Sequence, residues 1–147
     1  MTELPNTIDD LEDAIEALQI SNAHLTSEFR SFVDMLIHEN RLRDIVDGRL
    51  ELVSRYVSKD AFLSAQKEDP IRARINLELA RLAQENNDDE RYYGLLRCLR
   101  LIYVDEVEWE RVAQDSLVFT FCFYLRRVIS DIEPEFIEYL SHALLHR

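Results

Sequence analysis

The sequence predicts an all-α protein, a single-domain bundle of about seven helices over residues 1–147, packed around a hydrophobic central helix. Three observations support this fold class. Only 2 Gly and 3 Pro occur, too few for the turns of a β-sandwich or barrel. Apolar residues recur at helical spacing through most of the chain. Hydrophobic residues make up 47% of the total, which is enough for a sizeable core.

Three helices are expected in the first part of the chain. Thr7 is expected to cap the first. Ser27 is expected to cap the second, over residues 29–37, and these two helices could also form one continuous helix. The third is expected over residues 42–57. Its one unfavourable residue is Gly48, because glycine costs about 1 kcal/mol relative to Ala in a helix interior.

The middle of the chain carries clear start and stop signals. Asp60 is expected to cap a short turn. Asp69 followed by Pro70 is typical of a helix start, since proline at the first helical position removes an N–H that would have no partner. Asn86 and Asn87 are expected to end that helix.

The last part of the chain contains the expected centre of the bundle. Residues 92–103 form an amphipathic pattern that predicts a helix with one buried face. Residues 107–129 include SLVFTFCFYL, which is apolar nearly all round and predicts a helix surrounded by others. Asp131 and Pro134 are expected to open the last helix.

Composition excludes several classes of function. With 17 Lys+Arg and 29 Asp+Glu, the net charge is −12, which argues against binding to a nucleic-acid backbone. Cys98 and Cys122 lie among apolar residues, and the start of the chain is acidic where a secretory signal would be basic and then apolar. A reducing, cytoplasmic setting is therefore expected. The apolar run over residues 117–125 is shorter than the ~20 residues that cross a bilayer, so no membrane anchor is expected.

The sequence contains no positive case for catalysis. His142 and His146 have the i, i+4 spacing of a ligand pair, but zinc needs three or four converging ligands and no third can be named. No oriented nucleophile–base pair and no cofactor motif is present. We therefore expect no enzyme activity, no cofactor and no metal.

One segment carries a resemblance to a known family. Residues 103–112, with the sequence YVDEVEWERV, join the amphipathic helix to the apolar one. They resemble the BH1 region of the Bcl-2 family of apoptosis regulators, in which an aromatic residue, Asp-Gly-Val and Asn-Trp-Gly-Arg open the central helix. The matching residues are Asp105, Val107, Trp109, Arg111 and Val112. Glutamates stand where the family has Gly, Asn and Gly, at Glu106, Glu108 and Glu110.

Two further segments resemble motifs of the same family. Residues 138–144 are similar to the family's Tyr-Leu-Asn pattern on the helix beside the central one. Residues 42–47 resemble the BH3 motif, with Val46 where the family prefers a small residue. Residues 41–57 would then be the second family helix. The 62 residues from Asp47 to Trp109 are longer than the family pattern implies, so the resemblance is best over residues 91–146.

The resemblance implies a function without catalysis. It implies an inhibitor of apoptosis that sequesters the BH3 helices of pro-apoptotic proteins in a hydrophobic groove, where Arg111 pairs with an acidic residue of the ligand. Glu110 in place of glycine predicts a narrow ligand range. The expected groove residues are Val53, Tyr56, Leu95, Leu99, Ile102, Glu108, Trp109, Glu110, Arg111, Val112 and Val118.

The short chain without an anchor is similar to viral homologues, which implies the host-cell cytoplasm and a possible homodimer through an exposed apolar edge. Other interpretations stay open. Arg111 could pair internally with Asp105, Glu108 or Asp115, while Trp109 covers the core. The chain could then be an acidic helical adaptor whose binding does not depend on Arg111. It could also be an acidic decoy of nucleic acid, although Lys and Arg alternate with the acids along the helices.

Overall fold

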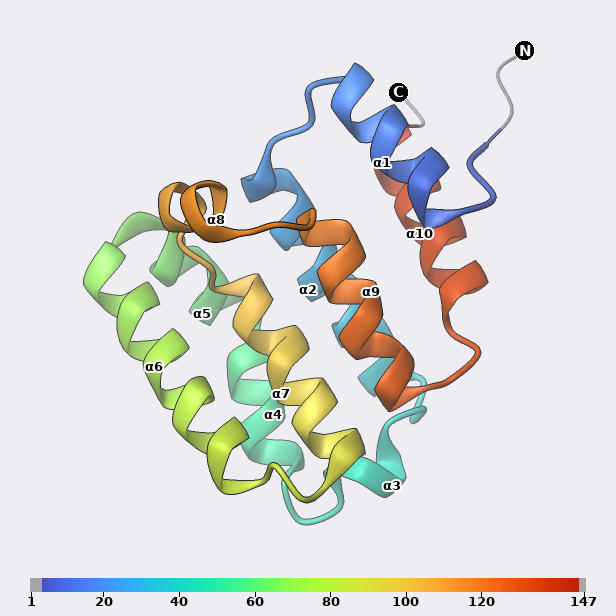
Figure 1. Cartoon of the computed structure of the whole chain (residues 1–147). Coiled ribbons are helices and arrows are strands. Elements are labelled where there is room, and N and C mark those ends of the chain that lie inside the picture. The colour runs from blue at the N-terminus through green and yellow to red at the C-terminus, as the bar shows by residue number, and fades with distance from the viewer. Residues whose placement is uncertain (1–3, 146–147) are drawn as a thin grey trace.

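The computed structural model describes residues 4–145, apart from the side chain of Val112. This part of the chain forms ten α-helices and no strand, which confirms the all-α class and replaces the expected count of about seven (Figure 1). The helices are α1 (Ile8–Ala17), α2 (Asn22–His38), α3 (Arg43–Val46), α4 (Leu50–Val57), α5 (Lys59–Lys67), α6 (Asp69–Glu85), α7 (Glu90–Ile102), α8 (Glu106–Val112), α9 (Leu117–Val128) and α10 (Glu133–Leu145).

Side-chain caps fix where several helices begin. Thr7 caps α1 as expected, because its side chain accepts a hydrogen bond from the Asp10 N–H. The cap of α2 is Ser21 and not Ser27, which lies inside the helix. Ser58 caps α5, so the expectation that Asp60 would do so was wrong. The α6 helix starts at Asp69 with proline in its first turn, close to the expected position.

Two predicted helices are each divided in two. Gly48 separates α3 from α4, and its φ of +76° lies in the left-handed region that glycine adopts most easily. Residues 113–116 separate α8 from α9, so residues 107–129 are not one helix. Ala113 leaves the helix in an extended conformation, and Ser116 caps α9 by accepting the Phe119 N–H. The local cap therefore outweighs the continuous apolar pattern.

The centre of the bundle is α7 and not the helix that follows it. Between its two ends, α7 packs against α2, α6 and α9, and nearly all of its apolar side chains are buried (Figure 1). The α9 helix leaves Phe119 and Phe123 exposed, at 42% and 45%. The sequence predicted that α9 would be central and that α7 would bury one face only, and the structure shows the reverse. Arginines do not prevent α7 from being packed by several helices, because their long apolar stems can lie along the surfaces of those helices.

Aromatic rings join three helices on the other side of α9. Phe29 of α2 stacks on Phe121 of α9 with ring centroids 4.2 Å apart. Phe136 of α10 lies 5.5 Å from Phe121 and 5.4 Å from Phe32 of α2. These contacts, together with α1 packed across α9 and α10, hold α9 so that its opposite face points to solvent (Figure 1).

The α8 helix lies on the surface where α9 begins (Figure 1). Among the side chains that the structure describes, none of those on α8 is buried, whereas each of the other nine helices contributes to the core. Within residues 4–145, no helix combines the length and the apolar character needed to cross a membrane.

Candidate functional site

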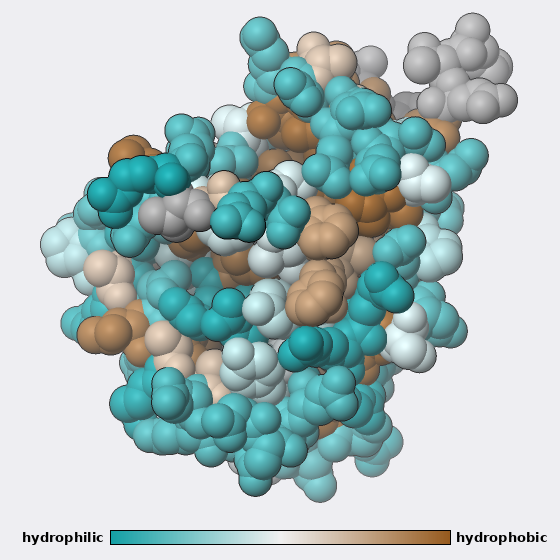
Figure 2. All heavy atoms as spheres, viewed as in Figure 1, coloured by the Kyte–Doolittle hydropathy of each residue, from teal (hydrophilic) through white to brown (hydrophobic). Residues whose placement is uncertain are grey.

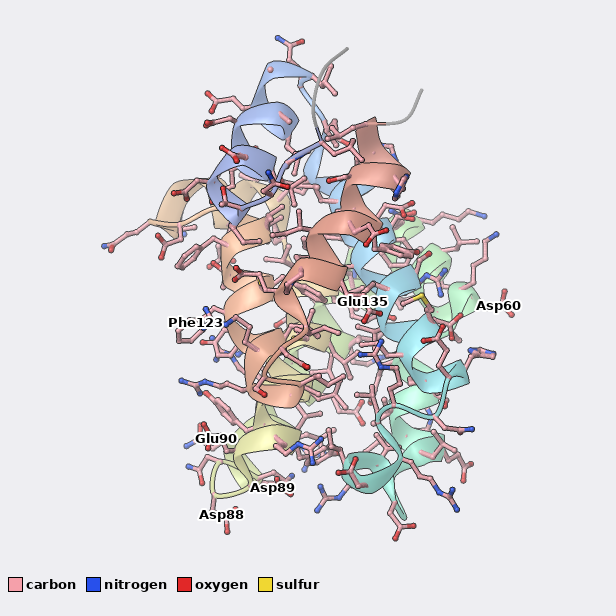
Figure 3. All side chains as sticks on the ribbon, turned by 90° about the vertical axis from the view of Figure 1, so that its right-hand side faces the viewer. Asp60, Asp88, Asp89, Glu90, Phe123 and Glu135 are labelled. Atoms are coloured by element: carbon pink, nitrogen blue, oxygen red, sulfur yellow. The ribbon has the colours of Figure 1, made fainter. Side chains whose placement is uncertain are left out.

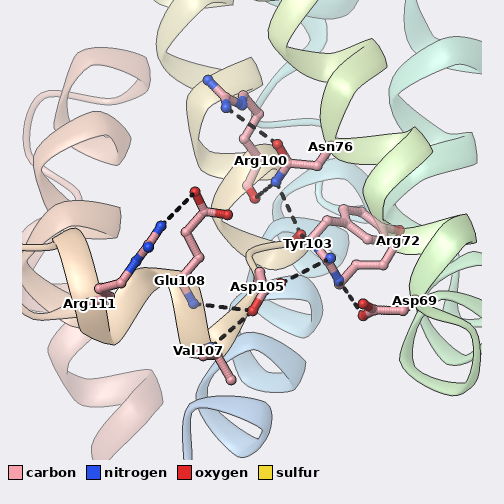
Figure 4. A network of polar contacts seen from close by, with 9 residues as sticks. All are labelled: Asp69, Arg72, Asn76, Arg100, Tyr103, Asp105, Val107, Glu108 and Arg111. Carbon is pink, nitrogen blue, oxygen red and sulfur yellow. Dashed lines mark hydrogen bonds and ion pairs between the residues drawn. The ribbon is translucent and has the colours of Figure 1, made fainter.

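The site lies at the junction of α7 and α8, where the BH1-like residues fall. Asp105 caps α8, and its Oδ1 accepts the N–H groups of Val107 at 3.0 Å and Glu108 at 3.2 Å (Figure 4). The negative charge also lies at the positive end of the helix dipole. This carboxylate therefore sets the start and the direction of α8.

Arg72 on α6 connects this cap to its neighbours. Its guanidinium donates to the Tyr103 carbonyl at 3.1 Å, to Asp105 Oδ2 at 3.4 Å and to Asp69 at 3.2 Å (Figure 4). Because the Arg72 side chain is only 17% exposed, these charge-assisted bonds form in a partly dry environment. Arg72 thus fastens the end of α7 and the start of α8 to α6.

Asn76, one turn further along α6, completes the junction. Its Nδ2 donates to the carbonyl oxygens of Arg100 at 3.2 Å, which also accepts the Tyr103 N–H, and of Tyr103 at 3.1 Å, at the C-terminal end of α7 (Figure 4). The Tyr103 hydroxyl donates to the Tyr56 carbonyl in the core, and burial raises its pKa, so it stays protonated.

Arg100 is the least satisfied charged group here. Its Nη2 donates to Asn76 Oδ1 at 3.3 Å, but its buried Nε has no hydrogen-bond partner. Burial, followed by the like charge of Arg97, lowers the pKa of Arg100. A hydrogen-bond acceptor that approached Arg100 would therefore give Nε a partner and would also favour the charged form of the guanidinium.

Hollows flank α8 on several sides. One, of about 400 Å³, lies between α6, α7 and α8; we call it the α6–α8 hollow. Its lining combines cations and apolar side chains with the carboxylates of Asp105 and Glu108; the cations and the larger apolar residues are Arg72, Arg97, Arg100, Leu77, Leu101 and Trp109. A second, of about 540 Å³, lies between α1, α2, α8 and α9 and is lined in part by acids. Trp109 borders both, so neither side of α8 is closely packed.

Four of the expected site residues on α8 are described in full. Arg111 is exposed, with 75% of its side chain accessible, and its one ion pair within residues 4–145 joins Nη2 to Glu108 at 3.9 Å (Figure 4). Glu108 and Glu110 are also exposed, whereas Trp109 is half-buried and packs against the core. Val112 ends α8, and its side chain lies outside the described residues. The Arg111–Glu108 pair is one of the internal pairings that the sequence left open.

The apolar residues expected in the groove are buried. They are between 0% and 4% exposed, so they line no open groove in this conformation, and their place in a partner groove stays a prediction. The three on α7 lie beneath α2, α6 and α9, the two on α4 are packed by α2 and α5, and Val118 is on α9; the sequence alone could not place these helices against one another. The residues are Val53, Tyr56, Leu95, Leu99, Ile102 and Val118.

Sequence reasoning missed Arg72 and Asn76, the two α6 residues that hold the junction. Each lies more than twenty residues before its partners, and no local pattern indicates such contacts. A local signal did exist for Asp105, because Asp followed three residues later by Glu108 resembles a capping box.

The cysteines and histidines give little support to nucleophilic catalysis or metal binding. Burial raises the pKa of the Cys98 thiol well above its usual value, and burial with the nearby Glu133 carboxylate raises that of Cys122 to about 12, so both thiols are poor nucleophiles at neutral pH. No group of three or more His, Cys, Asp or Glu residues within 4–145 could hold a metal ion. His142 lies 4.0 Å from Glu138, and His146 lies outside the described residues.

No protein-family model, curated protein or solved structure matches this chain. What the chain does must therefore be argued from the geometry of its own residues.

Proposed function

We propose that this protein binds an amphipathic, acidic helix of a partner protein at α8. The observation that carries the proposal is the exposed Arg111 guanidinium, weakly paired at 3.9 Å, next to a tryptophan that borders a hollow on each side of its helix. A guanidinium in this state can form a two-point contact with a carboxylate. The α6–α8 hollow beside it offers apolar side chains and further cations to the same helix.

The closed core is compatible with this mode of binding only if α8 moves. Apart from Trp109, which packs against the core, its described side chains are exposed, so lifting α8 from the bundle uncovers apolar surface chiefly at Trp109. The main ties are this tryptophan, the Asp105 cap and the contact of Asp105 with Arg72. A partner helix that binds better to the open form would shift the population toward it.

The finer proposal is that the partner helix is a BH3 helix and that the protein inhibits apoptosis by sequestering it. The order of the BH1-like residues 103–112 and the later residues 138–144 supports this proposal. The separation of α8 from α9 departs from a family pattern in which the Trp and Arg open the central helix itself.

A second candidate function is a helical adaptor that holds another protein through a different surface. The burial of Leu95, Leu99 and Ile102 favours it, because these residues offer no preformed groove. The two candidates differ in their dependence on Arg111.

The deciding experiment is an isothermal titration of the whole chain with a panel of pro-apoptotic BH3 peptides. We expect submicromolar binding of at least one peptide, its loss in Arg111→Ala, and unchanged binding in Arg74→Ala, a change of an exposed arginine on α6. Binding that Arg111→Ala leaves intact would favour the adaptor. The absence of binding to every peptide would remove the apoptotic proposal.

A further inference from the structure

A second surface, formed by α7 and α9, concentrates aromatic rings and arginines. Phe119, Phe123 and Arg127 lie four residues apart on α9 and so share one face of the helix. Phe123 points away from the bundle (Figure 3), and apolar side chains gather over α9 among hydrophilic neighbours (Figure 2). With Arg97 of α7 and Tyr124, these residues make up what we call the α9 face.

The two arginines of the α9 face lie against rings. The Arg97 Cζ is 4.8 Å from the centre of the Tyr124 ring, and the Arg127 Cζ is 5.0 Å from Phe123 and 5.6 Å from Tyr124. Such contacts use the flat side of a guanidinium and leave its N–H groups at the edge. Within residues 4–145, neither arginine forms an ion pair with a carboxylate.

Gly94 explains why these groups converge. A Cβ at this position of α7 would lie 3.0 Å from the Arg127 Cβ and 3.1 Å from the Tyr124 carbonyl oxygen. Glycine therefore lets α7 and α9 approach closely enough for Arg97 to reach the Tyr124 ring. The α9 face is held by this helix contact rather than by a loop.

The charge of the α9 face is opposite to that of the whole chain. Arg97, Arg126 and Arg127 lie in this region, and Arg126 is paired at 3.8 Å with Glu133. The chain as a whole carries −12, so a long polyanion such as nucleic acid would meet repulsion beyond this region. A short acidic segment that also carries apolar side chains can contact the arginines and the rings while it avoids Asp9 and Glu133, which border the hollow beside Phe119 and Phe123.

We propose that the α9 face is a docking surface for an acidic segment of a partner protein. Carboxylates of the segment bind Arg97 and Arg127, and its apolar side chains cover Phe119 and Phe123. Arginine and aromatic residues are the types that dominate binding energy at protein interfaces. The proposal does not rest on the helix site at α8: Arg97 also borders the α6–α8 hollow, but Phe119, Phe123, Tyr124 and Arg127 border neither hollow beside α8.

The test uses the whole chain and two labelled synthetic peptides of about four helical turns. One carries Glu on one helical face and Leu and Phe on the other; the second replaces every Glu with Gln. Binding is followed by fluorescence anisotropy at low and high salt.

The variants are Arg97→Gln with Arg127→Gln, and Phe123→Ser. The matched controls are Arg74→Gln on α6 and Leu63→Ser on α5, two exposed positions that line neither hollow beside α8, and circular dichroism checks that each variant is folded.

We expect the acidic peptide to bind at least about tenfold more tightly than the Gln peptide, which is about 1.4 kcal/mol. Every chain in this comparison also carries Arg111→Ala, which removes the helix site proposed at α8. The double arginine variant and Phe123→Ser should each lose about that factor, while both controls bind normally. Equal binding of the two peptides, or equal binding to the double variant and its control, would overturn the proposal. So would an acidic peptide that binds the chain with Arg111 but not the Arg111→Ala chain, because its site would then lie at α8 alone.

Two further measurements exclude other occupants. A single-stranded oligonucleotide that bound more tightly than the acidic peptide would overturn the proposal in favour of a nucleic-acid surface. Sedimentation of the chain alone would also overturn the proposal if it showed a dimer that the double arginine variant abolishes. The α9 face would then bind a second copy of the chain. We expect no such dimer and weaker oligonucleotide binding.

Discussion

Asp105 and Arg72 are joined at the point where α7 ends and α8 begins. One oxygen of the Asp105 carboxylate caps α8, and the other lies 3.4 Å from the Arg72 guanidinium. The same guanidinium also donates to the carbonyl oxygen of Tyr103, at the end of α7. A single carboxylate thus connects the direction of α8 to the position of α6.

Replacing this carboxylate separates its two contributions. Asp105→Ala removes the cap and the ion pair, and we expect it to lower the free energy of unfolding by about 1–2 kcal/mol. Asp105→Asn keeps a capping oxygen and loses only the charge, so we expect a loss below about 1 kcal/mol. Urea denaturation measures both. Equal losses in the two variants would contradict the assignment of Asp105 as a cap.

The two sides of α9 should respond very differently to truncation. Phe121→Ala removes a fully buried ring stacked on Phe29, and we expect a loss of about 3–5 kcal/mol. Phe123→Ala removes a ring that is 45% exposed, and we expect a loss below about 1 kcal/mol. Thermal or urea unfolding of the pair tests the placement of α9. Similar losses would mean that α9 is surrounded, as the sequence pattern predicted.

Replacing either glycine by alanine should lower the free energy of unfolding, for a different reason in each case. Gly94→Ala places a methyl group 3.0 Å from the Arg127 Cβ, and we expect a net loss of about 1–3 kcal/mol despite the higher helix propensity of alanine. Gly48→Ala meets no atom within 4 Å, but its φ of +76° costs about 1 kcal/mol. A stabilising Gly94→Ala would show that α7 and α9 are not in close contact.

Stability should fall in alkali. The pKa of Cys122 is raised from 9.0 to about 12 and that of Tyr56 from 10.0 to about 12, mainly by burial. Between these values the unfolded chain has lost protons that the folded chain keeps, so each group stabilises the fold below about pH 9 or 10 and stops doing so as pH approaches 12. Unfolding should be measured at stepped pH, with Cys122→Val as the variant that lacks the thiol contribution. A pH-independent stability above pH 9 would refute this.

Hydrogen exchange tests the surface position of α8. None of the described α8 side chains is buried, so we expect the amides of α8 to exchange much faster than those of α7, most of whose apolar side chains are buried. Arg72→Ala should increase the rate in α8 further and leave the middle of α7 unchanged. Equal protection of the two helices would mean that α8 opens only when the whole bundle unfolds.

The helical class could be predicted because it depends on local signals. Few glycines and prolines, regular apolar spacing and a cap such as Thr7 act within a few residues of the chain. The breaks at Gly48 and before Ser116 also have local causes, but there the apolar pattern on both sides continued in register and concealed them.

The central helix and the site could not be predicted in the same way. Which of two apolar helices lies at the centre depends on what packs over them, and the close approach at Gly94 is visible only once α9 is in place. The Arg72–Asp105 contact joins residues 33 positions apart. Arg111, by contrast, was identified as a candidate from its local motif, and its partner role stays a prediction.

The lack of buried side chains on α8 has a consequence for how this protein can evolve. Substitutions at the exposed α8 positions, Glu106 to Glu108, Glu110 and Arg111, alter the shape and charge of one surface and leave in place the core, which Trp109 alone of the described α8 side chains contacts. If the partner binds here as proposed, recognition and folding are under largely separate selection in this part of the molecule. A lineage could exchange its binding partner by mutation of a few codons and keep the same scaffold.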